Sequence, residues 1–487
     1  MQKGGSMFWR GVIGYLPVNI VQGLVGLLTI VTFTRLLTPG QFGDYAIGFA
    51  VMSLVHTSVF TWNEAAMARY WPSEDLRDGG ADHAAAIYRT WLILLAAVPL
   101  ACIVALALPL NSGLKLAIVA GLAAVLPRTF AKLAQERRRA AGEVGGSATI
   151  DLVQTLGGFM IGAGLVWAGW GGAGPLAGFG FASLICAVWC FRSEIGKAKG
   201  GRFEAVRLQR HAQYGVPLAL SLILSLILSS TDRFLLAAFL DEAAVGAYHA
   251  GYSLANRTLD VAFIWLGAAG GPALVMALER GGRDELITAA REQASLMILL
   301  TVPAAVGLAL VAAPLSHLMV GDGLADSAAQ VTPWIALSGL LAGLTTYYFN
   351  QAFILSQRTS LLLLAMAAPV IANIILNIIL IPRFGLHGAL WATLASYALG
   401  LLTAAILGRR SLPLPLPWLT LAQAVGAAAL MALVVSRIPA LGGLPELIAK
   451  AAAGAAVYGL IVYLVDAGEF RSRAEAVLRT LRARNAT

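Results

Sequence analysis

Charged and amide side chains recur at helical spacing inside one apolar segment, residues 245–274. The polar members of this stripe are His249, Tyr252, Ser253, Asn256, Arg257 and Asp260. They fall within an arc of about 140° when each residue is turned by ~100° around a helix axis. Arginine can hold a phosphate group through two hydrogen bonds, and aspartate can bind a cation or a proton. Lipid does not accept such a stripe, so it indicates a polar cavity or a polar helix contact.

Three further apolar segments, 12–36, 43–67 and 214–240, carry similar stripes. Their polar or small residues are Asn19, Gln22, Gly26 and Thr29 in the first segment, Ser53, His56, Thr57, Asn63 and Glu64 in the second, and Ser221, Ser225, Ser229 and Asp232 in the third. Together with 245–274, these segments predict a cavity lined by four helices. Glu64, Asp232 and Asp260 are candidates for ion coupling, with Na⁺ or H⁺ left open, and no other cofactor is expected.

Each charged candidate also has a structural interpretation. Arg257 lies one turn from Asp260, so the two residues could form an ion pair that only stabilises the helix. Arg35 and Arg233 lie near the ends of their segments, where a long cationic side chain can reach the membrane interface. Glu64 could lie close to the opposite interface. His56 and His249 are interpreted as hydrogen-bonded cavity residues rather than proton relays.

The elements that must position these residues are membrane-spanning helices. Hydrophobic residues make up 59% of the 487 residues, charged residues only 12%, and the mean hydropathy is +0.77. A soluble domain carries about 25% charged residues, and ~20 apolar residues suffice to cross a bilayer. The predicted spans are 12–36, 43–67, 87–109, 113–135, 148–169, 174–192, 214–240, 245–274, 287–315, 328–355, 360–382, 386–408, 416–436 and 444–465.

The basic residues are distributed unequally between the two sides of these spans. With the N-terminus placed in the cytoplasm, 27 Lys and Arg residues lie on the cytoplasmic side and 6 on the other. This bias predicts that both termini are cytoplasmic, and Arg137-Arg138-Arg139 is interpreted as a topology anchor. The pI of 9.6 is therefore a topology signal and does not predict nucleic-acid binding. Cys102, Cys186 and Cys190 lie in apolar segments, so neither a disulfide framework nor a metal site is predicted.

A short signature repeats about 200 residues apart. Gly43-x-Tyr45-x-x-Gly48-Phe49 matches Gly246-x-Tyr248-x-x-Gly251-Tyr252, and each block follows a span that ends near an arginine, Arg35 or Arg233. A second pair of glycine-spaced blocks, at 171–178 and 385–392, follows in the same order. Because the offset covers six spans, the two bundles should have the same orientation and be related by an axis along the membrane normal.

The segment Thr34-Arg35-Leu36-Leu37-Thr38-Pro39-Gly40-Gln41-Phe42-Gly43-Asp44-Tyr45 resembles the first-loop signature of Wzx-type polysaccharide flippases. These proteins belong to the multidrug/oligosaccharidyl-lipid/polysaccharide exporter superfamily. Thr231-Asp232-Arg233-Phe234, followed by Val245-Gly246-Ala247-Tyr248, is similar to the signature of the second half, and residues 381–393 resemble the junction of the eleventh and twelfth spans. The resemblance covers roughly residues 7–410.

This resemblance implies an all-α polytopic membrane protein of about 14 transmembrane helices. They would form two pseudo-twofold-related six-helix bundles plus two C-terminal helices, working by alternating access. The predicted parts are a first bundle (1–195), a cytoplasmic linker (196–212), a second bundle (213–410), two accessory helices (411–466) and a basic cytoplasmic tail (467–487).

The resemblance also implies a transporter, not an enzyme, whose substrate is an oligosaccharide on undecaprenyl pyrophosphate. It would work in the bacterial inner membrane for O-antigen, capsule or exopolysaccharide synthesis, with a polysaccharide polymerase and other assembly proteins as candidate partners. The predicted substrate-binding residues are Arg35, Arg233, Arg257, Asn256 and Tyr252. Two alternatives remain: a cation-coupled multidrug exporter of the same fold, and a membrane polysaccharide polymerase or acyltransferase. Short outer loops with few carboxylates or histidines disfavour the enzyme.

Overall fold

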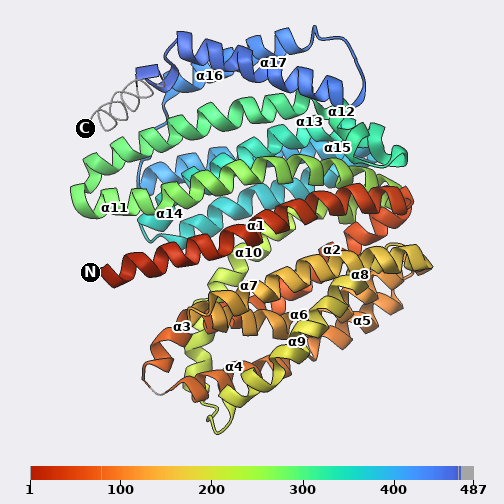
Figure 1. Ribbon diagram of the computed structural model, residues 1–487, viewed down its shortest axis with the longest axis vertical. Helices are drawn as coiled ribbons and strands as arrows, with labels where there is room; N and C mark the ends of the chain where they lie inside the picture. Colours follow the sequence, from red (N-terminus) through yellow and green to blue (C-terminus); the bar gives the residue numbers. More distant parts are fainter. Residues whose placement is uncertain (1, 78, 470, 473–487) are drawn as a thin grey trace, which may run out of the picture. The chain divides into compact units, whose positions relative to one another are not determined.

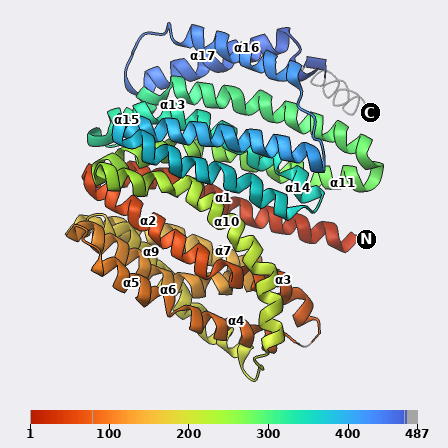
Figure 2. The ribbon, with the colours of Figure 1, turned by 180° about the vertical axis from the view of Figure 1, so that it is seen from behind.

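A computed structural model describes residues 2–77, 79–469 and 471–472, and no β-strand occurs among them (Figures 1 and 2). Most of the predicted tail, residues 473–487, lies outside the described residues, and so does the side chain of Asn19. The predicted all-α fold is confirmed.

The first half of the chain forms ten α-helices and two π-helical turns. Their bounds are α1 (Gln2–Leu36), α2 (Pro39–Val59), α3 (Thr61–Asp75), α4 (Gly80–Leu94), α5 (Ala97–Ala107), α6 (Ser112–Ala140), α7 (Val144–Leu152), η1 (Val153–Gly157), α8 (Gly158–Leu165), η2 (Val166–Trp170), α9 (Ala173–Ala198) and α10 (Ala205–Phe239).

The second half continues with longer helices. Their bounds are α11 (Glu242–Leu310), α12 (Ala312–Met319), α13 (Asp322–Leu344), the π-helical turn η3 (Thr345–Phe349), α14 (Gln351–Leu355), α15 (Thr359–Ser411), α16 (Trp418–Val435), α17 (Gly443–Leu464) and the 3₁₀ turn η4 (Ala467–Glu469).

By length and composition, 10 helices of the described chain can cross a membrane, or 11 if the bent pair α2–α3 is one span. Two of these helices cover two predicted spans each. Gly282 (φ 68°) breaks α11, and Gly385 (φ 57°) breaks α15. The first predicted span contains the shorter apolar helix Ile20–Leu36. The chain is therefore a multi-pass membrane protein.

The chain divides into two compact units, Met1–His249 and Ala250–Thr487, called here the N-terminal and C-terminal units. In the N-terminal unit, α6 packs against both α2 and α9, and α10 packs against α2 and α3. In the C-terminal unit, α13 packs against α12 and α15, and α16 packs against α17. The predicted bundle boundaries, which begin a second bundle at residue 213, stay a prediction.

The repeated glycines make equivalent helix contacts in the two halves. A Cβ on Gly48 would lie 2.6 Å from Leu176 Cδ1 and 3.0 Å from the carbonyl oxygen of Ala117, on α6. A Cβ on Gly251 would lie 2.6 Å from Val331 Cβ and 3.0 Å from the carbonyl oxygen of Ala328, on α13. The signature glycine thus lets span 43–67 approach span 113–135 in the first half, and span 245–274 approach span 328–355 in the second. Small residues allow such close approach between membrane helices.

The second pair of repeated blocks also adopts matching backbone conformations. Gly171 has φ 52° and ψ −140°, and Gly385 has φ 57° and ψ −134°, a region that only glycine enters without strain. Three residues later, Gly174 and Gly388 lie against the backbone of the preceding helix at Val166 and Leu380. The internal repeat is therefore present in the structure.

The Thr38–Gln41 segment of the first signature is a helix cap. The Gln41 backbone N–H donates to Thr38 Oγ1 at 3.3 Å, and the Thr38 N–H donates to Gln41 Oε1 at 3.1 Å. This reciprocal arrangement is a capping box, and Pro39 occupies the first helical turn, where its missing N–H costs nothing. Asp241 caps α11 in the other half by accepting the Ala244 N–H at 2.7 Å.

Gly43 gives a sharp test of the packing at the start of α2. A Cβ there would overlap the backbone carbonyl of Glu242 at the start of α11, whereas a Cβ on Gly40 would meet no atom within 4 Å. We expect Gly43→Ala to lower the thermal stability of the purified protein and its transport, since a backbone carbonyl cannot rotate away. Gly40→Ala is the matched control and should behave as wild type; equal stability of the two variants would contradict this packing.

Candidate functional site

A buried polar cluster lies at the bend between α2 and α3, whose axes differ by 51°. His56 is in the last turn of α2 and Glu64 in the first turn of α3, with relative exposures of 6% and 5%. His56 Nε2 lies 2.9 Å from Glu64 Oε1 and 3.2 Å from Oε2. The N-terminus of α3 also favours the Glu64 carboxylate. The two side chains thus connect the helices on either side of the bend.

Arg128 completes this cluster from α6. It lies close enough to Glu64 for their charges to interact, and its guanidinium lies 5.0 Å from the centroid of the Phe179 ring on α9. Its Nη1 atom is buried without a hydrogen-bond partner among the described residues. We call His56, Glu64 and Arg128 the bend cluster. It holds a carboxylate, an imidazole and a guanidinium, the groups that exchange protons and bind anions.

Arg128 was not among the predicted site residues, because it was counted with the basic residues of the cytoplasmic side. Its position inside the predicted span 113–135 was the only sequence signal for a membrane-embedded role.

Asp232 and Tyr248 form a second buried contact in the N-terminal unit. The Tyr248 hydroxyl donates to Asp232 Oδ2 at 2.6 Å, and both residues are 0% exposed. Tyr248 belongs to the repeated signature. A signature residue is therefore hydrogen-bonded to Asp232, one of the carboxylates predicted to take part in ion coupling. Arg233 is 7% exposed and donates from Nη1 to the carbonyl oxygen of Ser229 at 3.2 Å and to Ser230 Oγ at 3.4 Å.

The C-terminal unit contains a separate cluster on α11 and η3. Asn256 Nδ2 donates to Asp260 Oδ2 at 2.7 Å, and the charge of Asp260 acts on the Tyr347 hydroxyl. Tyr347 lies in the π-helical turn η3 and stacks on Phe263, with centroids 5.9 Å apart. Such π-turns are frequent at functional sites. We call Asn256, Asp260 and Tyr347 the π-turn cluster.

The remaining predicted arginines are more exposed. Arg257 is exposed and close enough to Asp260 for their charges to interact, but the described residues contain no ion pair between them. Arg35 is exposed at the end of α1 and donates to the carbonyl oxygen of Val31 at 3.1 Å. Tyr252 is half-buried. Arg35 and Arg233 belong to the N-terminal unit and Arg257 to the C-terminal unit, so a shared phosphate site stays a prediction.

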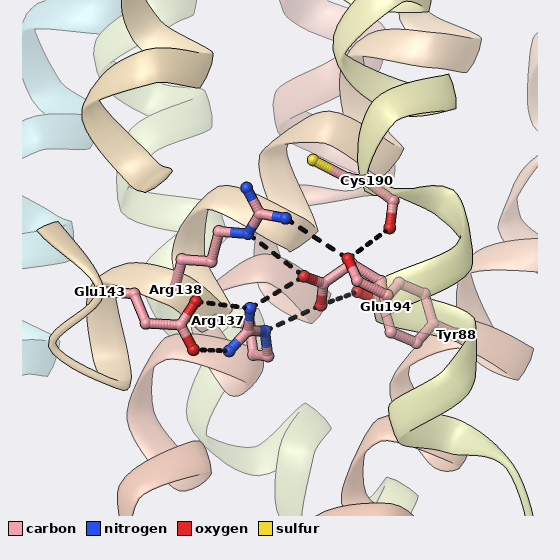
Figure 3. Close-up of polar contacts among 7 residues, drawn as sticks. Tyr88, Arg137, Arg138, Glu143, Cys190 and Glu194 are labelled. Carbon is pink, nitrogen blue, oxygen red and sulfur yellow. Dashed lines mark hydrogen bonds and ion pairs between the residues drawn. The ribbon is translucent and has the colours of Figure 1, made fainter. Parts of the chain in front are cut away.

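Figure 3 shows a buried ionic network that sequence reasoning missed. Arg137, only 2% exposed, donates from Nε and Nη2 to the Glu194 carboxylate at 2.8 and 2.9 Å. Glu194 is 0% exposed and also accepts the Tyr88 hydroxyl at 3.1 Å. Arg138 Nε lies 3.4 Å from Glu194 Oε1. The network joins α4, α6 and α9, so the predicted topology anchor is also a tertiary contact.

Glu143 closes the network from the loop between α6 and α7. Its two carboxylate oxygens accept hydrogen bonds from Arg137 at 2.6 and 3.1 Å. Hydrogen bonding to the Arg137 guanidinium holds the pKa of the Glu143 carboxyl below its ordinary value. Sequence offered a weak signal for this network: a triple arginine followed by an acidic residue, Glu143, four residues later.

The basic linker contacts the N-terminal unit through a second ionic group. Arg207 and Arg210 both donate to the carboxylate of Glu74 on α3, and the Arg202 backbone N–H donates to Asp82 Oδ1 at 2.7 Å. Two buried histidines lie beside it, with His83 Nδ1 3.1 Å from His211 Nε2. Two of the positive charges of this linker, those of Arg207 and Arg210, are therefore paired with Glu74 of α3.

Known structures share this arrangement of helices. The lipid II flippase MurJ in an inward closed conformation matches with a TM-score of 0.75 and 14% identity, over 93% of this chain and 99% of that chain. An inward-facing multidrug resistance MATE family transporter of the MOP superfamily matches with a TM-score of 0.63 and 13% identity, over 80% and 94%. An outward-facing multidrug resistance MATE family transporter of the MOP superfamily matches with a TM-score of 0.58 and 13% identity, over 83% of this chain and 95% of that chain. No curated protein sequence gives a significant match.

The chain has the fold of multi-pass membrane transporters, and the solved structures reported above are a flippase and transporters rather than enzymes. Residues 32–329 match the family described as "Polysaccharide biosynthesis protein", which is more than half of the chain. The chain belongs to this polysaccharide biosynthesis protein family. The resemblance to Wzx-type flippases is thus confirmed at the level of this family.

Proposed function

We propose that this protein is a flippase that moves an oligosaccharide linked to undecaprenyl pyrophosphate across the bacterial inner membrane by alternating access. The observation that carries the proposal is the family match over residues 32–329, in a chain with the fold of a lipid II flippase. The exported glycan would serve O-antigen, capsule or exopolysaccharide synthesis. A polysaccharide polymerase and other assembly proteins are the proposed partners, and both termini would be cytoplasmic because of the charge bias.

Substrate binding is assigned to the arginines of the polar stripes. Arg257 carries an exposed guanidinium beside the π-turn cluster, without an ion pair among the described residues. A guanidinium of this kind can hold a pyrophosphate with two parallel hydrogen bonds. Asn256 and Tyr252 belong to the same polar arc of this helix and would contact the sugar or the phosphates. Arg35 and Arg233, in the N-terminal unit, are the other arginines proposed to bind substrate.

Ion coupling is assigned first to the bend cluster. Glu64 and His56 share a buried contact at the junction of two helices, so gain or loss of one proton changes the charge at the bend and opposite Arg128. Burial makes such a change energetically large. A charge change at a helix bend can favour one of two helix arrangements, which alternating access requires. Asp232 and Asp260, which lie outside this cluster, are the other candidates for binding a coupling Na⁺ or H⁺.

A cation-coupled multidrug exporter is the second candidate, since MATE transporters share the fold. The two functions differ in substrate chemistry. Protein reconstituted in liposomes should expose an undecaprenyl pyrophosphate-linked glycan to an external glycosidase or lectin if it is a flippase. Accumulation of a lipophilic cation without glycan movement would instead show a multidrug exporter.

The same liposome assay tests Arg257. We expect Arg257→Ala to abolish glycan movement while the protein inserts at near-normal levels, because removing a membrane-embedded arginine also removes an insertion penalty. Arg257→Lys should retain partial activity, since lysine keeps the positive charge but cannot form the two parallel hydrogen bonds to a phosphate. If Arg257 only stabilises Asp260, the double variant Arg257→Ala with Asp260→Ala should recover transport. That recovery would contradict the substrate-binding role.

A further inference from the structure

An apolar groove of about 940 Å³ runs along α6 and α9 in the N-terminal unit, with α4 on one side. Its floor consists of small residues, among them Ala120, Ala123 and Ala124 of α6 and Ala177 and Gly180 of α9. Gly180 allows the close approach, because a Cβ there would lie 2.9 Å from Ala124 Cβ. The groove therefore forms because small residues on two tightly packed helices leave space between larger side chains.

The groove is long enough to hold an extended hydrocarbon chain. On α6 its lining runs from Leu116 to Phe130, and on α9 from Ala177 to Arg192. At 1.5 Å of rise per residue, each length is roughly 20 Å, or about two thirds of a ~30 Å hydrocarbon core. The larger lining residues, including Leu116, Phe181 and Val188, are exposed. An acyl chain lying along the helices would fill this space.

One end of the groove has a fixed aromatic wall. Trp91 Nε1 donates to Thr129 Oγ1 at 2.9 Å, which holds the indole ring in place. The Phe130 ring lies 5.2 Å from the Trp91 ring and 5.6 Å from the Phe191 ring, measured between centroids. The wall is therefore built by tertiary contacts and does not depend on a bound molecule.

Arg192 lies at this aromatic end, and no described residue neutralises its charge. The side chain is exposed, and no carboxylate of the described residues pairs with it. The nearby arginines differ, because Arg137 and Arg138 pair with Glu194 and Arg139 pairs with Glu136. A guanidinium at the end of an apolar groove is complementary to a ligand with a hydrocarbon chain and an anionic phosphate head.

We propose that this groove binds an anionic phospholipid, with one acyl chain along α6 and α9 and its phosphate against Arg192. A free phosphate would leave the apolar length unused, and a zwitterionic lipid would bring a second positive charge close to the guanidinium. Neither the bend cluster residues nor the predicted substrate-binding residues line this groove. The proposal is independent of the transported substrate.

Native mass spectrometry of the purified full-length protein tests this proposal. The protein is incubated with phosphatidylglycerol or phosphatidylcholine of identical acyl chains, and bound lipid is counted. We expect retention of one phosphatidylglycerol. Arg192→Gln should weaken this retention about fivefold, as expected for the ~1 kcal/mol that one basic residue contributes near an anionic lipid surface. Ala123→Phe should weaken it further by filling the floor at an exposed position.

Two matched controls accompany these variants. Arg283→Gln removes an exposed arginine from α11, and Ala451→Phe adds a ring at an exposed position of α17, both far along the chain from the groove. Neither should change lipid retention. Equal retention of the two lipids, or no loss in either groove variant, would show ordinary surrounding lipid and overturn the proposal. Displacement of phosphatidylglycerol by equimolar undecaprenyl phosphate would also overturn it, by identifying a carrier site.

Discussion

Glu194→Ala is expected to destabilise the purified protein by about 3–5 kcal/mol, the usual consequence of leaving a buried cation without its partner. Glu194 is fully buried and accepts hydrogen bonds from Arg137 and Tyr88, with Arg138 also beside it. Without that carboxylate, the buried Arg138 guanidinium would lose its ion-pair partner, and Arg137 would keep only Glu143. The measurement is thermal unfolding in detergent, read as loss of the monodisperse peak after heating.

Two variants serve as controls for this prediction. Glu136→Ala removes a carboxylate from the Lys132 pair on the same helix, where a more accessible i,i+4 contact contributes at most ~1 kcal/mol. Tyr88→Phe removes one hydrogen bond to Glu194 and should cost about 1 kcal/mol. If Glu194→Ala unfolds no earlier than Glu136→Ala, the network shown in Figure 3 does not stabilise the fold.

Glu64→Gln is expected to abolish gradient-driven transport. Glutamine keeps the size of the side chain and can still accept a hydrogen bond from His56, but it cannot carry the charge that the bend cluster would gain and lose. We expect at least a tenfold loss of the rate driven by a proton or sodium gradient, or ~1.4 kcal/mol in the barrier. The measurement is glycan movement in liposomes with an imposed H⁺ or Na⁺ gradient, compared with no gradient. Glu279→Gln, at an exposed position of α11, is the matched control.

A second variant separates coupling from folding. Glu64→Gln leaves the Arg128 charge without its nearby carboxylate, which alone could lower stability. The double variant Glu64→Gln with Arg128→Gln removes both charges and should recover thermal stability without recovering gradient-driven transport. Recovery of gradient-driven transport in this double variant would show that Glu64 has only a structural role.

The membrane class and the internal repeat could be predicted from sequence because each depends on properties that can be read along the chain. Apolar length sets whether a segment can cross a bilayer, and that length is read directly along the chain. The signature glycines Gly48 and Gly251 were recognised by spacing alone, and the structure shows that both let helices approach closely. The capping box at Thr38 is likewise local, since its partner Gln41 lies three residues away.

Which polar side chains contact one another was decided by tertiary packing. The stripes on 43–67 and 245–274 indicated that His56, Glu64, Asn256 and Asp260 face a polar environment. A stripe does not, however, identify the residues that contact it. Arg128 lies 64 residues after Glu64, and Glu194 lies 57 residues after Arg137, so no helical period connects them. The distribution of basic residues even favoured a purely topological role for Arg128 and Arg137. Their buried contacts arise only when α6 packs between α3 and α9, because charge compensation in a low-dielectric interior depends on distance in space.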